Sequence, residues 1–217
     1  MPKIITCKEA VALIKPNSRI LFGGFLGVGC AENIVDGLVE SGIKDLHIIV
    51  IASDFEDKGV GKLVVNSQVK SAQVSHLGTN KTIQSQMHSG QVEVEIIPQG
   101  TLMERIRAKG AGLGGILTPT GVGTVVAENK ELFNIEGKEY ILEKAISADF
   151  AIIRAAKADK QGNLIYNKTA RNSNPIMAMC GDVTIVEVDE IVEVGELSAE
   201  EIITPGIFVD YLVLHDI

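Results

Sequence analysis

The amino-acid sequence predicts an α/β protein with an open, mainly parallel sheet flanked by helices. Residues 19–22 and 46–51 are short, largely apolar runs, which is typical of strands buried on both faces of a sheet. Between them, residues 32–39 place apolar side chains at helical spacing, and Gly42 follows as a stop signal. A strand, a helix and a second strand in this order predict parallel pairing, because parallel neighbours need a crossover connection.

The same alternation continues along the chain. Residues 73–77 and 92–97 are predicted strands, with a polar helix between them at 82–88. A further helix is predicted at 102–108, after Pro98-Gln99-Gly100. Three more strands are predicted later in the sequence, at residues 150–154, 183–188 and 208–214.

The middle of the chain is dense in glycine. Of the 22 glycines, six fall between residues 110 and 123, and Pro119 interrupts the same stretch. So many glycines predict a long irregular loop, and long ordered loops are often functional. Directly afterwards, residues 132–135 and 140–142 flank Glu136-Gly137-Lys138, which predicts a β-hairpin.

Composition limits the class of protein. The 217 residues, 46% hydrophobic and 22% charged, predict one globular domain spanning residues 1–217. The net charge of −8 is spread along the chain and only 4% of the residues are aromatic, which argues against a nucleic-acid surface. Neither a signal peptide nor a membrane span is recognisable, so we expect a cytoplasmic protein without nucleic-acid or membrane partners.

The sequence carries no signature of a metal site or of a common nucleophile. Its odd number of scattered cysteines predicts neither a disulfide framework nor zinc, and its histidines lack the spacing of metal ligands. We interpret the histidines as structural and predict no metal. There is also no G-x-S-x-G elbow. The residues concerned are Cys7, Cys30, Cys180, His47, His76, His88 and His215.

A glycine-rich segment, residues 23–29, lies between a predicted strand and a predicted helix. Its backbone amides and the helix N-terminus offer a place for an anion, or for close approach of a ligand. It is not a dinucleotide fingerprint, and no Walker lysine follows. The alternative interpretation is a tight turn without a ligand.

Gln99 follows a predicted strand at the carboxyl edge of the sheet, where open α/β sheets bind ligands. Its amide is suited to donating a hydrogen bond to an oxyanion, although it could equally pair with loop backbone. Glu104, Arg105 and Arg107 lie on the following helix. An arginine there could hold a carboxylate or phosphate, but a solvated helix face with local ion pairs is the favoured interpretation.

Several of these segments together resemble the family I coenzyme A transferases, specifically their smaller, alpha-type chain. The match covers essentially the whole chain. It departs from the family at Gly29-Cys30-Ala31, where the glycine signature usually ends in proline. The matching segments are Ile20-Leu21-Phe22-Gly23-Gly24-Phe25, Pro98-Gln99-Gly100-Thr101-Leu102, Glu104-Arg105-Ile106-Arg107, Thr118-Pro119-Thr120-Gly121-Val122-Gly123-Thr124, Lys157-Ala158-Asp159, Gly162-Asn163-Leu164, Lys168-Thr169-Ala170-Arg171-Asn172, Asn174-Pro175 and Thr204-Pro205-Gly206.

The resemblance implies the CoA-transferase fold and transfer of coenzyme A, as substrate rather than cofactor, from acetyl-, butyryl- or succinyl-CoA to a carboxylate such as acetoacetate. In the family a glutamate forms an acyl anhydride and then an enzyme thioester. That glutamate belongs to a beta subunit, within a Ser-Glu-Asn-Gly motif, in an α2β2 heterotetramer. The resemblance also implies that Gln99 positions substrate or holds an oxyanion, and that six residues bind substrate. These are Gly23, Gly24, Phe25, Gly27, Gly100 and Thr101.

This chain lacks the nucleophile motif. The nearest segments, Ala31-Glu32-Asn33-Ile34 and Ala127-Glu128-Asn129-Lys130, have neither the serine nor the glycine. We therefore expect the chain to supply half of a composite site. Two other hypotheses stay open: a catalytically silent binding or regulatory protein on the same fold, and, with less support, a sugar-phosphate isomerase or related enzyme.

Overall fold

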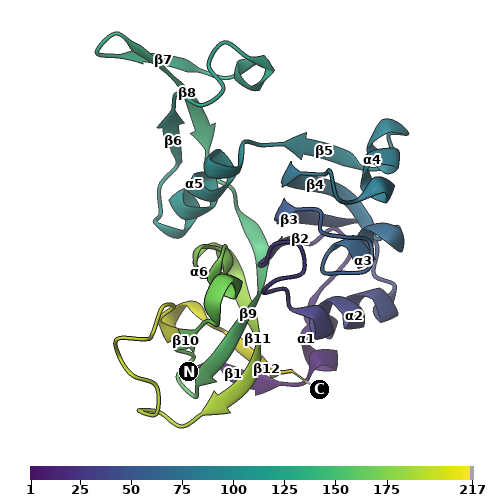
Figure 1. Ribbon diagram of the computed structural model, residues 1–217, viewed down its shortest axis with the longest axis vertical. Helices are drawn as coiled ribbons and strands as arrows, with labels where there is room; N and C mark the ends of the chain where they lie inside the picture. The colour runs from purple at the N-terminus through teal and green to yellow at the C-terminus, as the bar shows by residue number, and fades with distance from the viewer. Residues whose placement is uncertain (216–217) are drawn as a thin grey trace.

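The computed structural model describes residues 1–215 and contains two sheets (Figure 1). The strands are β1 (Lys3–Ile5), β2 (Arg19–Phe22), β3 (Leu46–Ala52), β4 (Val69–His76), β5 (Glu93–Ile96), β6 (Gly115–Thr118), β7 (Leu132–Ile135), β8 (Lys138–Lys144), β9 (Ala148–Asp159), β10 (Leu164–Ile165), β11 (Gly181–Val192) and β12 (Tyr211–Leu214). The helices are α1 (Cys7–Leu13), α2 (Glu32–Ser41), α3 (Gly61–Val65), α4 (Lys81–His88), α5 (Gln99–Gly110) and α6 (Asn174–Met177), with 3-10 turns η1 (Val125–Ala127), η2 (Lys168–Arg171) and η3 (Gly206–Phe208).

The main sheet confirms the predicted fold class. Its strand order is β1-β12-β11-β9-β2-β3-β4-β5, and every neighbouring pair on this path is parallel. Only β10, which pairs with β9 off this path, is antiparallel. From β2 the chain builds outward to β5 and then returns to the other side of β2 with β9. The order therefore reverses between β2 and β9, the kind of position where open α/β sheets bind ligands.

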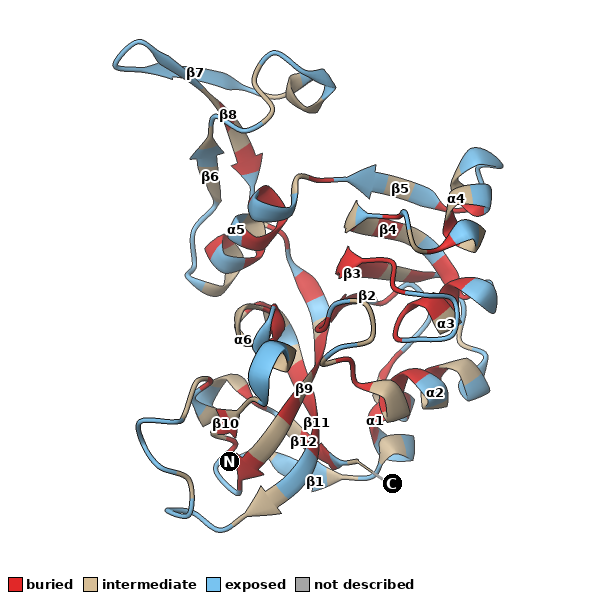
Figure 2. Ribbon diagram, viewed as in Figure 1, coloured by how far each residue is buried: buried red, intermediate tan, exposed pale blue. Residues whose placement is uncertain are grey.

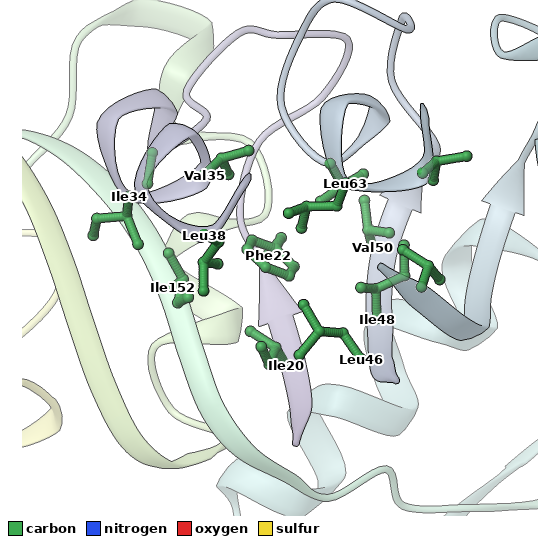
Figure 3. Packing of buried hydrophobic residues seen from close by; sticks show 14 of the residues in the cluster. Ile20, Phe22, Ile34, Val35, Leu38, Leu46, Ile48, Val50, Leu63 and Ile152 are labelled. Carbon is green, nitrogen blue, oxygen red and sulfur yellow. The ribbon is translucent and has the colours of Figure 1, made fainter. Parts of the chain in front are cut away.

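Hydrophobic side chains cover both faces of this sheet because strand residues alternate in direction. Ile20 and Phe22 of β2 face the layer formed by α1 to α4, and Leu21 faces α5 and α6. Figure 3 shows the first layer, where Leu38 of α2 and Leu63 of α3 point toward the strands. Each such fully buried Leu or Ile contributes roughly 1.5–3 kcal/mol, so the core fixes the sheet edge on which the site lies.

A second, three-stranded antiparallel sheet, in the order β6-β8-β7, extends away from the main sheet (Figure 1). We call residues 115–144 the arm. Figure 2 shows it mostly exposed, in contrast to the red central strands. Its tip confirms the predicted hairpin: Glu136 and Gly137 have φ of 52° and 80°, the two positive values of a type I′ turn.

The predicted irregular loop at residues 110–123 is wrong in part, because α5 runs to Gly110 and β6 occupies Gly115–Thr118. Two glycines of this stretch are needed for close packing, and not because the chain there is irregular. A Cβ on Gly110 would lie 2.7 Å from Cβ of Met179, and one on Gly115 would lie 2.5 Å from the carbonyl oxygen of Glu143. Gly121 and Gly123, with φ of 94° and 75°, do form turns.

Other boundaries differ from the predicted ones. β9 and β11 are 12 residues each, and the last strand begins at Tyr211 because η3 occupies Gly206–Phe208. The sequence patterns did not predict β1, α1, α3 or α6. Among residues 1–215, no helix combines the length and apolar composition needed to cross a membrane.

Candidate active site

Gln99 stands between two cavities at the carboxyl edge of the main sheet. It is the first residue of α5, which begins three residues earlier than predicted. One cavity has a volume of about 550 Å³ and the other about 490 Å³; Ile51, Gln99 and Asn172 line both. The Gln99 side chain is exposed and makes no hydrogen bond within residues 1–215, so its amide is not paired with loop backbone.

The larger cavity is polar around the first turn of α5. Gly100 and Thr101 line it, as do Thr118 and Thr120 of the arm and Ser173. Thr101 is only 4% exposed, and its hydroxyl oxygen has no hydrogen-bond partner in the described part of the chain. Pro98 precedes the helix without a capping side chain. The uncapped amides and positive dipole end of α5 suit this cavity to negative charge on an oxygen.

The smaller cavity is mainly apolar. Phe25, Val28 and Ile51 form its apolar wall beside Gln99, with Ser75, Thr169 and Asn172 completing the lining. Phe25 is 40% exposed and Val28 46%. Exposed apolar side chains gathered at a cavity suit a small apolar group. Gln99 is therefore placed where a carbonyl oxygen could meet its amide while an attached hydrocarbon lies against Phe25.

Three of the predicted substrate-binding glycines have packing reasons of their own. A Cβ on Gly23 would lie 1.8 Å from Oδ1 of Asn174, and one on Gly24 would lie 2.4 Å from Sγ of Cys30. Gly24 and Gly27 also have φ of 109° and 84°. None of the three lines either Gln99 cavity. Contact of Gly23, Gly24 and Gly27 with substrate thus stays a prediction, whereas Phe25, Gly100 and Thr101 do lie at the cavities.

Sequence reasoning assigned no role to the residues that hold the glycine segment. The side chain of Asn174 is fully buried: its Nδ2 donates to the carbonyls of Gly29 (3.1 Å) and Ala170 (2.7 Å), and its Oδ1 accepts from the backbone N–H of Arg154 (3.1 Å). Asn172 Nδ2 donates to the carbonyl of Val28 at 2.9 Å. The two family-like segments around residues 20–25 and 168–175 thus meet, although about 150 residues separate them. In the sequence, the pattern Asn172-Ser173-Asn174-Pro175 was the signal that could have pointed to these residues.

The carboxylates that sequence reasoning considered are held elsewhere. Glu32 accepts from the backbone N–H of Gly59 at 2.9 Å and pairs with Lys62 at 2.7 Å. Glu128 is exposed on the arm. Cys30 is buried, and burial beside Asp54 raises the pKa of its thiol, which keeps the sulfur protonated and unreactive.

The charged residues of α5 have two different roles. Arg107 pairs with Glu104 at 3.1 Å at the rim of the larger cavity, which confirms the local ion pair. Arg105 is not on a solvated face: its Nε donates to the carbonyl of Lys144 at 2.8 Å, and Nη1 contacts Glu95 at 3.1 Å and the buried Glu143 at 3.6 Å. Arg105 therefore ties α5 to the arm and to β5. Helical spacing alone could not reveal this role, because Glu95, Glu143 and Lys144 lie outside the helix.

The histidines lie outside the two cavities and make local contacts. Nδ1 of His47 is 2.7 Å from the Ser71 hydroxyl, that of His88 is 2.7 Å from a backbone carbonyl, and that of His215 is 2.8 Å from Glu187. These contacts agree with the structural interpretation for three of the four histidines, which stays a prediction.

Comparison with a family model and comparison with individual proteins point to the same family. Residues 4–215 match the family model described as Coenzyme A transferase. The alpha subunit of the acetate CoA-transferase of Escherichia coli K12 is 46% identical over 212 residues, covering 98% of this chain and 96% of that protein. The corresponding chain of a probable succinyl-CoA:3-ketoacid coenzyme A transferase of Bacillus subtilis is 47% identical over 215 residues, covering 99% and 90%.

Among solved structures, the acyl-CoA transferase YdiF of E. coli O157:H7, as a thioester complex with CoA, superposes with a TM-score of 0.87 at 23% identity. The match covers 99% of this chain but only 47% of YdiF, so this chain spans about half the length of that protein. At this identity the likeness establishes the fold.

Proposed function

Because the chain belongs to the coenzyme A transferase family, we propose that it is the alpha-type subunit of an enzyme that transfers coenzyme A from acetyl-, butyryl- or succinyl-CoA to a short carboxylate such as acetoacetate. Relatives named for acetate and for succinyl-CoA with a 3-ketoacid support this range of substrates. Residues 1–217 act as one domain in this proposal, and coenzyme A is a substrate.

The observation that carries the proposal is the position of Gln99 between an apolar cavity and a polar one. A short acyl tail fits against Phe25 and Val28, which leaves the carbonyl oxygen beside the Gln99 amide. That oxygen becomes negatively charged when a nucleophile adds to the carbonyl carbon. An amide that donates to the oxygen at that point stabilises the charge more in the transition state than in the ground state, which is the condition for catalysis.

The nucleophile comes from a partner chain in this proposal. Within residues 1–215, Glu104 is the one carboxylate that lines either Gln99 cavity, and Arg107 is paired with it. Relatives that are themselves named as subunits support the existence of a partner. Since Gln99 is exposed in the isolated chain, a second chain has access to it. We assign to that chain a glutamate in a Ser-Glu-Asn-Gly setting, and to the complex an α2β2 arrangement.

The chemistry proceeds in two halves. The partner's glutamate attacks the thioester carbonyl carbon, the C–S bond breaks, coenzyme A leaves as a thiolate, and an acyl anhydride remains on the glutamate. The thiolate then attacks the glutamyl carbonyl, which releases the first acid as a carboxylate and leaves a glutamyl-CoA thioester. The acceptor carboxylate passes through the same steps in reverse. Gln99 donates to the oxygen that carries the charge in the steps at the acyl carbon.

The test is reconstitution. The purified chain alone should show no transfer, and activity should appear on mixing or co-expression with the glutamate-bearing chain. A screen of acetate, butyrate, succinate and acetoacetate as acceptors then identifies the pair. Transfer by this chain alone would contradict the composite site. A complex that assembles and binds acyl-CoA but transfers to no acceptor would favour the silent binding protein instead.

A further inference from the structure

The first turn of α5 has three free backbone donors, and all three belong to residues that line the larger cavity. The N–H groups of Gln99, Gly100 and Thr101 make no hydrogen bond within residues 1–215, whereas the N–H of Leu102 donates to the carbonyl of Pro98 at 2.9 Å. The first turn contains neither a capping side chain nor an acidic residue. Because the helix is 12 residues long, this end carries a partial positive charge.

Thr101 points independently to a ligand at the same place. Its side chain is only 4% exposed, and its hydroxyl oxygen has no hydrogen-bond partner in the described part of the chain. Such a group is rare in proteins, because it gives up water without gaining a partner. Thr101 lines the larger cavity, so a ligand oxygen bound there would supply the missing hydrogen bond.

The other polar side chains of this cavity are already engaged. Glu104 and Arg107 are the charged residues of its lining, and they pair with each other at 3.1 Å, so their charges offset. The Ser173 hydroxyl has two hydrogen bonds with other residues of the chain, and the Thr118 hydroxyl accepts from the N–H of Thr120 at 3.2 Å. The positive charge that lacks a partner therefore lies at the first turn of α5.

The two cavities meet at Gln99 and differ in polarity. An acyl group whose carbonyl lies beside the Gln99 amide has two directions for its tail, because Gln99 lines both cavities. The wall of Phe25 and Val28 suits a hydrocarbon, and the first turn of α5 suits a negatively charged oxygen. Butyryl and succinyl groups have the same number of carbons but different ends, so the two cavities would separate them.

We propose that the first turn of α5, together with the Thr101 hydroxyl, is a subsite for a carboxylate at the far end of the acyl group, so that the chain accepts dicarboxylic acids such as succinate as well as apolar acids. Thr101 is then a specificity-determining residue. A neutral ketone oxygen, as in acetoacetate, accepts the same hydrogen bonds, but only a carboxylate also gains from the charge of the helix end. This inference rests on the proposed function, because it starts from a reacting carbonyl beside Gln99.

The first test removes the Thr101 hydroxyl in the assembled enzyme. Thr101→Val keeps the shape of the side chain. With acetate as the acceptor, kcat/KM is measured for succinyl-CoA and for butyryl-CoA, and their ratio gives the preference. The preference for succinyl-CoA should fall about tenfold or more, which is the typical effect of losing a hydrogen bond to a charged group. Thr169→Val, which removes a hydroxyl from the smaller cavity, is the matched control and should not lower this preference.

Three results of this test would overturn the inference. One is a preference in Thr101→Val equal to that of the unaltered enzyme. Another is an equal loss for both thioesters, which would assign the larger cavity to coenzyme A itself. The third is an unaltered enzyme that uses butyryl-CoA but does not accept succinyl-CoA.

The second test places a charge in the subsite, and it decides the matter if Thr101→Val does not fold. Gly100 is exposed, and a Cβ there would have nothing within 4 Å, so aspartate and asparagine both fit. The carboxylate of Gly100→Asp should take the helix end and repel a second carboxylate. The preference for succinyl-CoA should therefore be about tenfold or more lower in Gly100→Asp than in Gly100→Asn. Equal preferences in the two variants would contradict the subsite.

Acetoacetyl-CoA distinguishes a carboxylate from a ketone oxygen. Its preference over butyryl-CoA should differ less between Gly100→Asp and Gly100→Asn than the preference for succinyl-CoA does, because the ketone carries no charge. A larger difference for acetoacetyl-CoA would assign the subsite to a ketone oxygen and reject the carboxylate.

Binding without turnover separates this inference from the proposed function. Saturation-transfer NMR on the full chain uses monomethyl succinate and methyl butyrate, whose ester groups stand for the thioester. Monomethyl succinate should receive less saturation from Gly100→Asp than from Gly100→Asn, and methyl butyrate should not distinguish them. No difference for monomethyl succinate would refute the subsite, whatever the enzyme does. A difference in a chain whose complex transfers no coenzyme A would retain the subsite and reject the proposed function.

Discussion

Replacing Asn174 by alanine should destabilise the chain strongly, because one buried amide joins three segments. Its three hydrogen bonds go to backbone groups at Gly29, Ala170 and Arg154. Without the amide, these groups lose their partner in a site that is fully buried. At roughly 1 kcal/mol for each hydrogen bond, the free energy of unfolding should fall by about 3 kcal/mol. For a chain of this size that corresponds to a melting temperature lower by about 6–12 °C.

Asn172→Ala is the matched control. Asn172 also donates to a carbonyl of the glycine segment, at 2.9 Å from Val28, and its side chain has further hydrogen bonds with Thr169 and Ser173. Asn172 is exposed, however, so water can replace the lost hydrogen bonds. Thermal unfolding followed by circular dichroism, with urea titration for the free energy, should show a loss below about 1 kcal/mol for this variant. Equal and small shifts for both variants would refute the argument that the buried amide holds the site together.

Three further predictions concern other parts of the chain. Gln99→Ala should lower kcat in the assembled enzyme about a hundredfold or more, roughly 3 kcal/mol, while the melting temperature stays unchanged. Gln99→Glu should lower kcat further, because a carboxylate would face the oxyanion. A near-normal kcat for Gln99→Ala would rule out the oxyanion role. Arg105→Ala should lower stability by about 2 kcal/mol in urea titration, since the buried Glu143 loses one of its two cations and Lys144 a donor, whereas Arg107→Ala should cost under about 1 kcal/mol. Asp54 binds its proton more tightly in the folded chain than in the unfolded one, so its contribution to stability is present below about pH 4 and is lost by about pH 6 to 7. The rise in its pKa from 3.8 to about 6 corresponds to roughly 3 kcal/mol. Urea titrations across this pH range should show a smaller fall in the free energy of unfolding for Asp54→Asn than for the unaltered chain.

Local patterns sufficed to predict the two strands β2 and β3 and the helix α2 between them. The apolar runs of β2 and β3 and the helical spacing of apolar residues in α2 involve residues close together in the sequence, so periodicity reveals them. The signal for α1 was also local: Thr6 and Glu9 form a reciprocal capping box, with the N–H of each accepted by the side chain of the other.

What the sequence could not reveal depends on distant contacts. Gly115 allows β6 to approach Glu143, 28 positions away, so local glycine density was misleading. Asn174 likewise meets Gly29 from 145 positions away. The edge of the sheet that carries Gln99 could be predicted from topology, but the two cavities needed side chains from the arm and from residues 169–176.

The composite site, in which this chain supplies the pocket and a partner supplies the nucleophile, can be tested by locating the covalent intermediate. Incubating the assembled enzyme with acyl-CoA and no acceptor should build up the glutamyl-CoA thioester, which borohydride then reduces at the glutamyl carbon. Mass spectrometry of the digested complex should find the altered glutamate in the partner's Ser-Glu-Asn-Gly segment and none in this chain. An altered Glu32, Glu104 or Glu128 would contradict the composite site.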